Sequence, residues 1–206
     1  MSDPLLKLIA SGLRLWIASR CDSVGALELT LRGSSLALLQ GRLEGVDLKA
    51  RQVCFDGLPL QSAAISSGPV RLDLSLLKPG RMLALRDPFQ VNGTVTLPGA
   101  ELNAALGSER WRSLGDWMAE QLLGITPLGS LRIDNKVLEL RAQVSAHADC
   151  IQRRFLLQAQ AGTVQFCPLN QDGTPTALPM DPAIRITDVE LSAGQIILTG
   201  VADVKP

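Results

Sequence analysis

Apolar and polar residues alternate through most of this chain, from Val24 to Val204, and one block with helical spacing, Pro98–Leu123, interrupts the pattern. The runs Ala26–Arg32 and Gly41–Ala50 show the alternation most clearly. Successive side chains of a strand point to opposite faces, so a period of two predicts strands with one apolar face. We expect residues 1–206 to form a single α+β domain, with a mainly antiparallel, strongly curved β-sheet packed on about three helices.

Pairs of turn-forming residues separate several of these runs. They are Asp56-Gly57, Asn135-Lys136, Ala161-Gly162 and Ala193-Gly194. Such pairs suit the tight loops of antiparallel hairpins, and we expect a turn at each. At Gly45 the apolar spacing changes from two to three, which predicts a β-bulge.

The helical block 98–123 reads as two consecutive helices. Gly107 is expected to end the first helix, and Ser108 to cap the start of the second. Gly124 is expected to end the second helix in the same way.

Residues 3–20 have helical spacing and begin with Asp3-Pro4, a typical helix start. The stretch is too short and too charged to span a membrane, and its early acid and interrupting cations are unlike a signal peptide. One interpretation packs this helix on the sheet. The other places it at a membrane interface, with its cations at lipid headgroups and Trp16 at the boundary. Both can hold together.

The composition excludes some classes of function. Basic and acidic residues both number 20, which gives a net charge of zero and argues against nucleic-acid binding. Hydrophobic residues make up 46% of the chain but aromatic residues only 3%, so the apolar mass is aliphatic and suited to acyl chains. The mean hydropathy of +0.19 lies at the apolar end for a globular protein.

Candidate chemistry is sparse. His147 and Cys150 stand three residues apart, an odd separation that places them on opposite faces of a strand, so we expect no catalytic pair. We likewise expect no metal, no cofactor and no enzymatic activity. We expect the four cysteines to be free thiols, and the alternative is a Cys21–Cys54 or Cys150–Cys167 disulfide. Acidic residues that alternate with apolar ones are expected on solvent-exposed faces, some of them opposite Arg or Lys. They are Glu28, Glu44, Asp47, Asp73, Glu139 and Glu190.

Four segments, taken in order, resemble the LmeA-like phospholipid-binding family. They are an N-terminal helix leading into Ala26–Leu29, the stretch Gly41–Leu48, the strand-to-helix segment Gly93–Leu106, and the closing hairpin Val189–Gly200. The resemblance covers nearly the whole chain. The chain departs from the family at Pro98-Gly99, where the family often has polar or acidic residues, and in lacking the signal or anchor of secreted members.

The resemblance implies a long curved sheet wrapped on helices, with an apolar groove for phospholipid acyl chains and no catalytic residues. The chain resembles a cyanobacterial-type member of the family, without a signal peptide. For such a member we expect a cytoplasmic location, peripheral to a membrane.

We therefore expect non-enzymatic binding of a phospholipid or similar amphiphile in an apolar groove, for lipid transfer or membrane contact. The alternative is a protein–protein scaffold or an assembly factor at a membrane. A large apolar cavity would favour the lipid, and a filled core with a flat exposed patch would favour the scaffold. The candidate ligand-binding residues are Leu5, Leu8, Ile9, Leu13, Trp16, Trp111, Leu114, Trp117, Met118 and Leu122.

Overall fold

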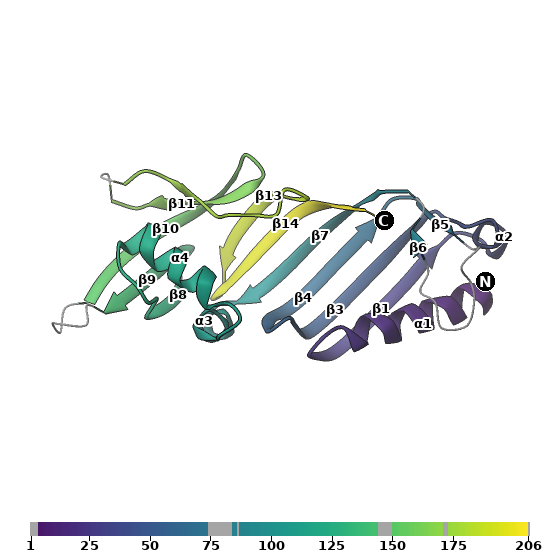
Figure 1. Ribbon diagram of the computed structural model, residues 1–206, viewed down its shortest axis with the longest axis horizontal. Helices are drawn as coiled ribbons and strands as arrows, with labels where there is room; N and C mark the ends of the chain where they lie inside the picture. The colour runs from purple at the N-terminus through teal and green to yellow at the C-terminus, as the bar shows by residue number, and fades with distance from the viewer. Residues whose placement is uncertain (1–3, 74–83, 86, 144–149, 171–172, 206) are drawn as a thin grey trace.

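The computed structural model describes residues 4–73, 84–85, 87–143, 150–170 and 173–205. The elements form an elongated molecule with one large sheet and a smaller sheet at one end (Figure 1). The helices are α1 (Pro4–Ser19), α2 (Ser35–Leu39), α3 (Gly99–Gly107) and α4 (Arg112–Leu123). The strands are β1 (Ser23–Arg32), β2 (Arg42–Leu43), β3 (Gly45–Phe55), β4 (Leu58–Ser67), β5 (Val70–Asp73), β6 (Ala84–Leu85), β7 (Phe89–Pro98), β8 (Ser130–Asp134), β9 (Val137–Gln143), β10 (Cys150–Gln160), β11 (Thr163–Pro168), β12 (Thr176–Ala177), β13 (Ile184–Ser192) and β14 (Gln195–Val204).

The main sheet has six antiparallel strands in the order β1-β3-β4-β7-β14-β13. Its centre joins distant parts of the chain, because β14 pairs with β7 along its whole length, from Gln195 opposite Pro98 to Val204 opposite Phe89. The chain between them forms α3, α4 and a second sheet with the order β12-β11-β10-β9-β8. A third, three-stranded sheet consists of β2, β5 and β6.

The alternation in sequence gives the main sheet one apolar and one polar face. Helix α1 covers part of the apolar face, where Leu6, Ile9 and Leu13 pack in one cluster with Leu29 and Leu31 of β1. The opposite face carries the short polar side chains described below.

The largest hydrophobic core lies at the other end of the molecule. There α3 contacts both the main sheet and the second sheet, α4 packs on α3 and on the second sheet, and Leu138, Leu140 and Phe155 are fully buried. The rings of Phe155 and Phe166 meet edge to face, with their centroids 6.2 Å apart. This region is therefore a filled core of the ordinary kind.

The predicted α+β class with mainly antiparallel strands is confirmed, and so are the helical block and the four hairpin turns. Both central residues of each turn have a positive φ, as two-residue loops of the mirror-image type require. A fourth helix, α2, was not predicted. The Ser34 hydroxyl caps it by accepting a hydrogen bond from the Ala37 N–H.

Two predictions about local structure are wrong. Ser108 does not cap α4, because its hydroxyl donates to the Ala105 carbonyl at the end of α3, and α4 begins four residues later, at Arg112. Gly45 marks no bulge: it begins β3, where the chain passes from the three-stranded sheet into the main sheet. Gly124 does end α4 in the left-handed region, as predicted.

Glu139 also differs from the prediction, because it is buried and not on a solvent-exposed face. Its carboxylate lies 2.7 Å from Arg141 and 3.1 Å from Arg154, and it accepts a hydrogen bond from Gln152. Burial alone would raise the pKa of Glu139, but the hydrogen bonds and charges of the two arginines outweigh it and lower the pKa. Among the other acids, Asp47 does pair with Arg32 on the neighbouring strand, at 2.8 Å.

Candidate functional site: an open apolar groove

The apolar face of the main sheet is not completely covered. Between the C-terminal half of α1 and strands β1, β3, β4 and β7 lies a groove of about 580 Å³. One wall is formed by Trp16 and Ile17 of α1 together with Arg20 and Cys21, which directly follow this helix, and the lining is almost entirely apolar. The remaining residues that line it are Val24, Leu27, Leu48, Ala50, Val53, Phe55, Leu60, Ala63, Ile65 and Val95.

Two alanines make the floor of the groove deep. Leu27, Ala50, Ala63 and Val95 lie side by side in one row across β1, β3, β4 and β7. The two alanines occupy the middle of this row, between the larger side chains of Leu27 and Val95. Because a methyl group fills little of the space above a strand, the helix and the larger side chains leave a hollow over Ala50 and Ala63.

The mouth of the groove is amphipathic. Trp16 and Phe55 are both partly exposed to solvent there, and the guanidinium carbon of Arg20 lies 5.5 Å from the centroid of the Trp16 ring. This distance is typical of a cation–π contact. The mouth therefore places a positive charge beside the entrance to an apolar compartment.

A second, smaller cavity of about 170 Å³ lies farther along the same face, beneath α3 and α4. Leu58, Leu97 and Leu198 form its sheet side, and Trp111 and Leu114 contribute from the helical block. Trp111 is fixed there by a 2.8 Å hydrogen bond from its indole N–H to the Asp56 carbonyl. Leu60 and Val95 pack against the clusters on both sides, so the apolar surface is continuous from the groove to this core.

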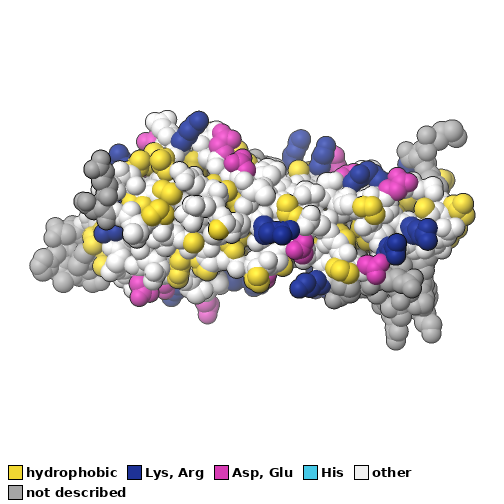
Figure 2. Space-filling model, turned by 90° about the horizontal axis from the view of Figure 1, so that it is seen from above, with side chains coloured by type: hydrophobic (Ala, Val, Ile, Leu, Met, Phe, Trp, Pro, Cys, Tyr) yellow, Lys and Arg dark blue, Asp and Glu magenta, His cyan; other side chains and the backbone are white. Residues whose placement is uncertain are grey.

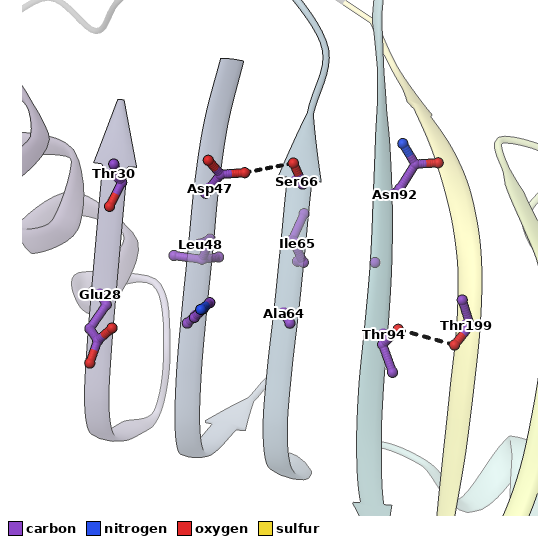
Figure 3. A pocket seen from close by; sticks show the side chains of 12 residues that line it. Glu28, Thr30, Asp47, Leu48, Ala64, Ile65, Ser66, Asn92, Thr94 and Thr199 are labelled. Carbon is purple, nitrogen blue, oxygen red and sulfur yellow. Dashed lines mark hydrogen bonds between the residues drawn. The ribbon is translucent and has the colours of Figure 1, made fainter. Parts of the chain in front are cut away.

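The opposite face of the main sheet carries a polar trough of about 570 Å³ (Figure 3). Four of its side chains are bonded in pairs: Ser66 donates to Asp47 at 2.6 Å, and the hydroxyls of Thr94 and Thr199 lie 3.0 Å apart (Figure 3). Ala64, next in sequence to groove residue Ala63, lies in this trough. The two faces of the same strands thus differ sharply in chemistry.

The structure divides the candidate ligand-binding residues into separate groups. Of those in α1, Trp16 lines the groove, Ile9 and Leu13 pack beside it on the sheet, Leu8 points to solvent, and the side chain of Leu5 lies outside what is described. The residues from the helical block lie in the largest hydrophobic core, around α3, α4 and the second sheet. Trp111, Leu114 and Met118 line the small cavity there, and Trp117 and Leu122 pack in the surrounding cluster.

Sequence reasoning missed the floor of the groove. Leu27, Ala50, Ala63 and Val95 read as ordinary inward-facing strand residues, which suit a core as well as a binding surface. The useful signal was the placement of alanine at two inward-facing positions, where a filled core would use a larger side chain.

Two thiols lie in or beside the groove. Its thiol, Cys21, and neighbouring Cys54 both have a pKa raised chiefly by burial, with the negative charge of Asp22 adding to the effect, so they are poor nucleophiles at neutral pH. Within the described residues, no three His, Cys, Asp or Glu side chains gather where they could hold a metal ion. The predicted non-catalytic role of His147 is untested, because it lies outside these residues.

On the side of the molecule seen in Figure 2, basic and acidic side chains are interspersed, so no large area of this side carries charge of one sign only. Among the described residues, none of the helices has the length and apolar character needed to cross a bilayer.

The structure thus defines a class of protein in which an amphipathic helix covers part of a sheet and leaves an apolar groove open. The chain belongs to the LmeA-like phospholipid-binding family, whose family model matches residues 2–201, nearly its whole length. No curated protein and no solved structure gives a match. The family assigns phospholipid binding as the general function, in agreement with the expected resemblance.

Proposed function

We propose that this chain is a non-enzymatic binding protein that holds an acyl chain of a phospholipid, or of a similar amphiphile, in the groove between α1 and the main sheet. The observation that carries this proposal is the groove itself: about 580 Å³, almost wholly apolar, and open to solvent on one side. Its size lies within the usual range of about 300–1,000 Å³ for small-molecule sites.

The driving force is burial of acyl methylenes. Each buried methylene contributes about 0.8 kcal/mol, so a chain with about ten methylenes in the groove gains about 8 kcal/mol before the costs of association. The floor and the helical wall supply apolar contacts, and no acidic side chain lines the groove among the described residues. Binding of this kind depends on length and shape more than on the identity of the chain.

The headgroup would lie at the mouth, where Arg20 can meet a phosphate. A guanidinium binds phosphate oxygens through charge-assisted hydrogen bonds, and the partly exposed Trp16 suits the boundary between apolar and wet regions. The lipid would therefore enter tail first and exchange with a membrane through the same opening.

We place the protein in the cytoplasm, peripheral to a membrane. The support is that Cys21, Cys54, Cys150 and Cys167 are all free, as is usual in a reducing compartment. The alternative function, a protein–protein scaffold, needs a filled core beneath the exposed surface, and the groove favours the lipid instead.

The test is native mass spectrometry of protein purified without detergent, followed by extraction and identification of bound lipid. We expect a stoichiometric lipid adduct on the wild type. Ala63→Phe would fill the groove floor and remove the adduct, whereas Ala64→Phe, on the polar face of the same strand, would keep it.

Thermal unfolding of both variants, together with Ala50→Leu as a milder filling of the same hollow, separates a filled groove from a misfolded chain. A wild type without lipid that also fails to take up a fluorescent phospholipid would overturn the proposal and favour the scaffold.

A further inference from the structure

Helix α1 has a second apolar side that nothing in the described structure covers. Leu8 and Leu15 are 71% and 68% exposed, and Leu36 and Leu39 of the neighbouring helix α2 are 69% and 66% exposed. We call these four side chains the leucine surface. Isolated exposed leucines are common on proteins, but four that are each about two-thirds exposed on two adjoining helices mark an interaction surface.

The side chains of α1 are arranged in three lines along the helix. Residues seven apart lie on the same side of an α-helix, two turns from each other. Leu6 and Leu13 form the line that packs on the sheet, and Leu8 and Leu15 form the exposed line. Lys7 and Arg14 form a third line beside the exposed leucines, so cations border the leucine surface.

The charge of α1 is entirely positive. Pro4–Ser19 contains Lys7 and Arg14 and no acidic residue, and Arg20 follows directly after the helix. On the other flank of the exposed leucines stands Trp16, with its ring under the Arg20 guanidinium. Exposed leucines bordered by Lys, Arg and Trp are the composition of a helix that lies in the plane of a membrane interface.

The α2 leucines extend the same end of the molecule. Leu38 of α2 is buried in one cluster with Leu6 of α1, which fixes the short helix against the N-terminal half of α1. Both helices lie at the same end of the main sheet, away from the second sheet (Figure 1). The leucine surface therefore belongs to two helices that share one hydrophobic cluster.

We infer that the leucine surface docks on an anionic phospholipid bilayer, with Leu8, Leu15, Leu36 and Leu39 inserted among the acyl chains and Lys7 and Arg14 at the headgroup phosphates. The occupant is assigned from charge complementarity, because an all-cationic helix matches a negatively charged surface. In this orientation Trp16 and Arg20 bring the mouth of the groove to the bilayer. That consequence rests on the proposed lipid binding, but the docking itself does not.

The test is flotation of the full chain with vesicles of phosphatidylcholine alone and of phosphatidylcholine with phosphatidylglycerol. We expect binding to the mixed vesicles and much weaker binding to the neutral ones. The double variant Leu8→Gln/Leu15→Gln should bind the mixed vesicles at least about tenfold more weakly, since each leucine contributes about tenfold on burial.

The matched control is Leu156→Gln/Leu169→Gln, which changes two other partly exposed leucines, located on β10 and just after β11. It should bind as the wild type does. A second variant, Lys7→Glu/Arg14→Glu, should lose the preference for anionic vesicles, because each cation near such a surface contributes about fivefold. All these positions are exposed, so unfolding curves should match those of the wild type.

Two results would overturn the inference and point to a protein partner for this surface. One is wild-type protein that binds neither kind of vesicle, and the other is a Leu8→Gln/Leu15→Gln variant that binds as well as the control. Native mass spectrometry distinguishes this failure from failure of the proposed function. A variant that keeps its lipid adduct but no longer floats has lost docking alone, and a floating protein without an adduct has lost groove binding alone.

Discussion

The apolar face of the main sheet is covered in two different ways at its two ends. Near α1 a single helix leaves a groove of about 580 Å³, whereas α3, α4 and the second sheet close the other end down to a cavity of about 170 Å³. Two strands, β4 and β7, contribute to both regions. The difference lies in what covers the sheet and in the size of the side chains on it.

This difference indicates separate roles for the two ends, stability at the closed end and ligand binding at the open end. The closed end contains Leu138, Leu140 and Phe155, fully buried, and supplies most of the cohesion of the fold. The open end has alanines where the closed end has leucines, so it gives up packing and keeps room for a ligand. Substitutions at the closed end should therefore affect stability, and substitutions at the open end should affect lipid binding.

A pair of phenylalanines gives the largest expected contrast. Phe155 is 1% exposed in the closed core and Phe55 is 50% exposed at the groove. Phe155→Ala should lower the free energy of unfolding by about 3–5 kcal/mol because it leaves a cavity in a packed core, whereas Phe55→Ala should change it by less than about 1 kcal/mol. Denaturant unfolding followed by circular dichroism measures both. Equal losses would contradict the division.

The second contrast is between the stability contributions of two carboxylates, one buried and one exposed. Glu139→Gln, in the second sheet, should cost about 1–3 kcal/mol because the buried oxygens hold two arginines, and Asp47→Asn, in the exposed pair with Arg32, should cost less than about 1 kcal/mol. The Glu139 side chain is 10% exposed and the Asp47 side chain 36%. Denaturant midpoints of the two variants at neutral pH measure the difference, and similar midpoints would contradict it.

The Glu139 contribution also depends on pH. Its pKa is lowered in the folded protein, so the stabilisation is complete above the ordinary glutamate value of about 4.3 and is lost as the pH falls through the lower folded-state value. The gap in stability between wild type and Glu139→Gln should therefore narrow below that pH. A gap that stays constant down to acid unfolding would show that the charge contributes nothing.

Two tryptophans test whether lipid binding and stability depend on different ends of the sheet. Trp16→Ala removes part of the groove wall and should weaken lipid binding by about tenfold with little loss of stability. Trp111→Ala loses the hydrogen bond to the Asp56 carbonyl and should cost about 2 kcal/mol of stability with less effect on binding. Fluorescent-lipid titration and thermal unfolding give the two readouts. The reverse pattern would place the ligand under α4.

The smallest effects concern the helices that close the second cavity. Gly124 ends α4 with a φ of 80°, so Gly124→Ala should cost about 1 kcal/mol. Gly107 lies within α3 with open space around its α-carbon, and Gly107→Ala should instead stabilise the protein by about 0.5–1 kcal/mol. Thermal melts of the two variants should therefore shift in opposite directions, and neither variant should change lipid binding.

Much of the fold was predictable because its strands and turns are specified locally. Alternation predicts β1 and β3, and pairs such as Ala193-Gly194 predict the hairpins, since the required backbone angles depend on adjacent residues. The pairing of β14 with β7 was not predictable, because it joins residues about a hundred positions apart and leaves no trace in local periodicity. The separation of β8–β12 into a second sheet was missed for the same reason.

The site was predictable only in part. Helical spacing in α1 identified Trp16 and the two interpretations of that helix, but it could not show which apolar side would meet the sheet. An inward-facing leucine of β1 looks the same in sequence whether a helix or a ligand covers it. The helical block illustrates this limit: Trp111 and Met118 have the same amphipathic pattern as α1 but lie in the closed core.

The most direct test of the account is photo-crosslinking with a phospholipid that carries a diazirine in its acyl chain, followed by peptide mapping. The groove predicts crosslinks to the C-terminal half of α1, to Cys21 just after this helix, and to inward-facing residues of β1, β3 and β4 such as Leu27 and Leu60. Crosslinks confined to β8–β11, or to the polar trough around Ser66 and Thr94, would contradict the account.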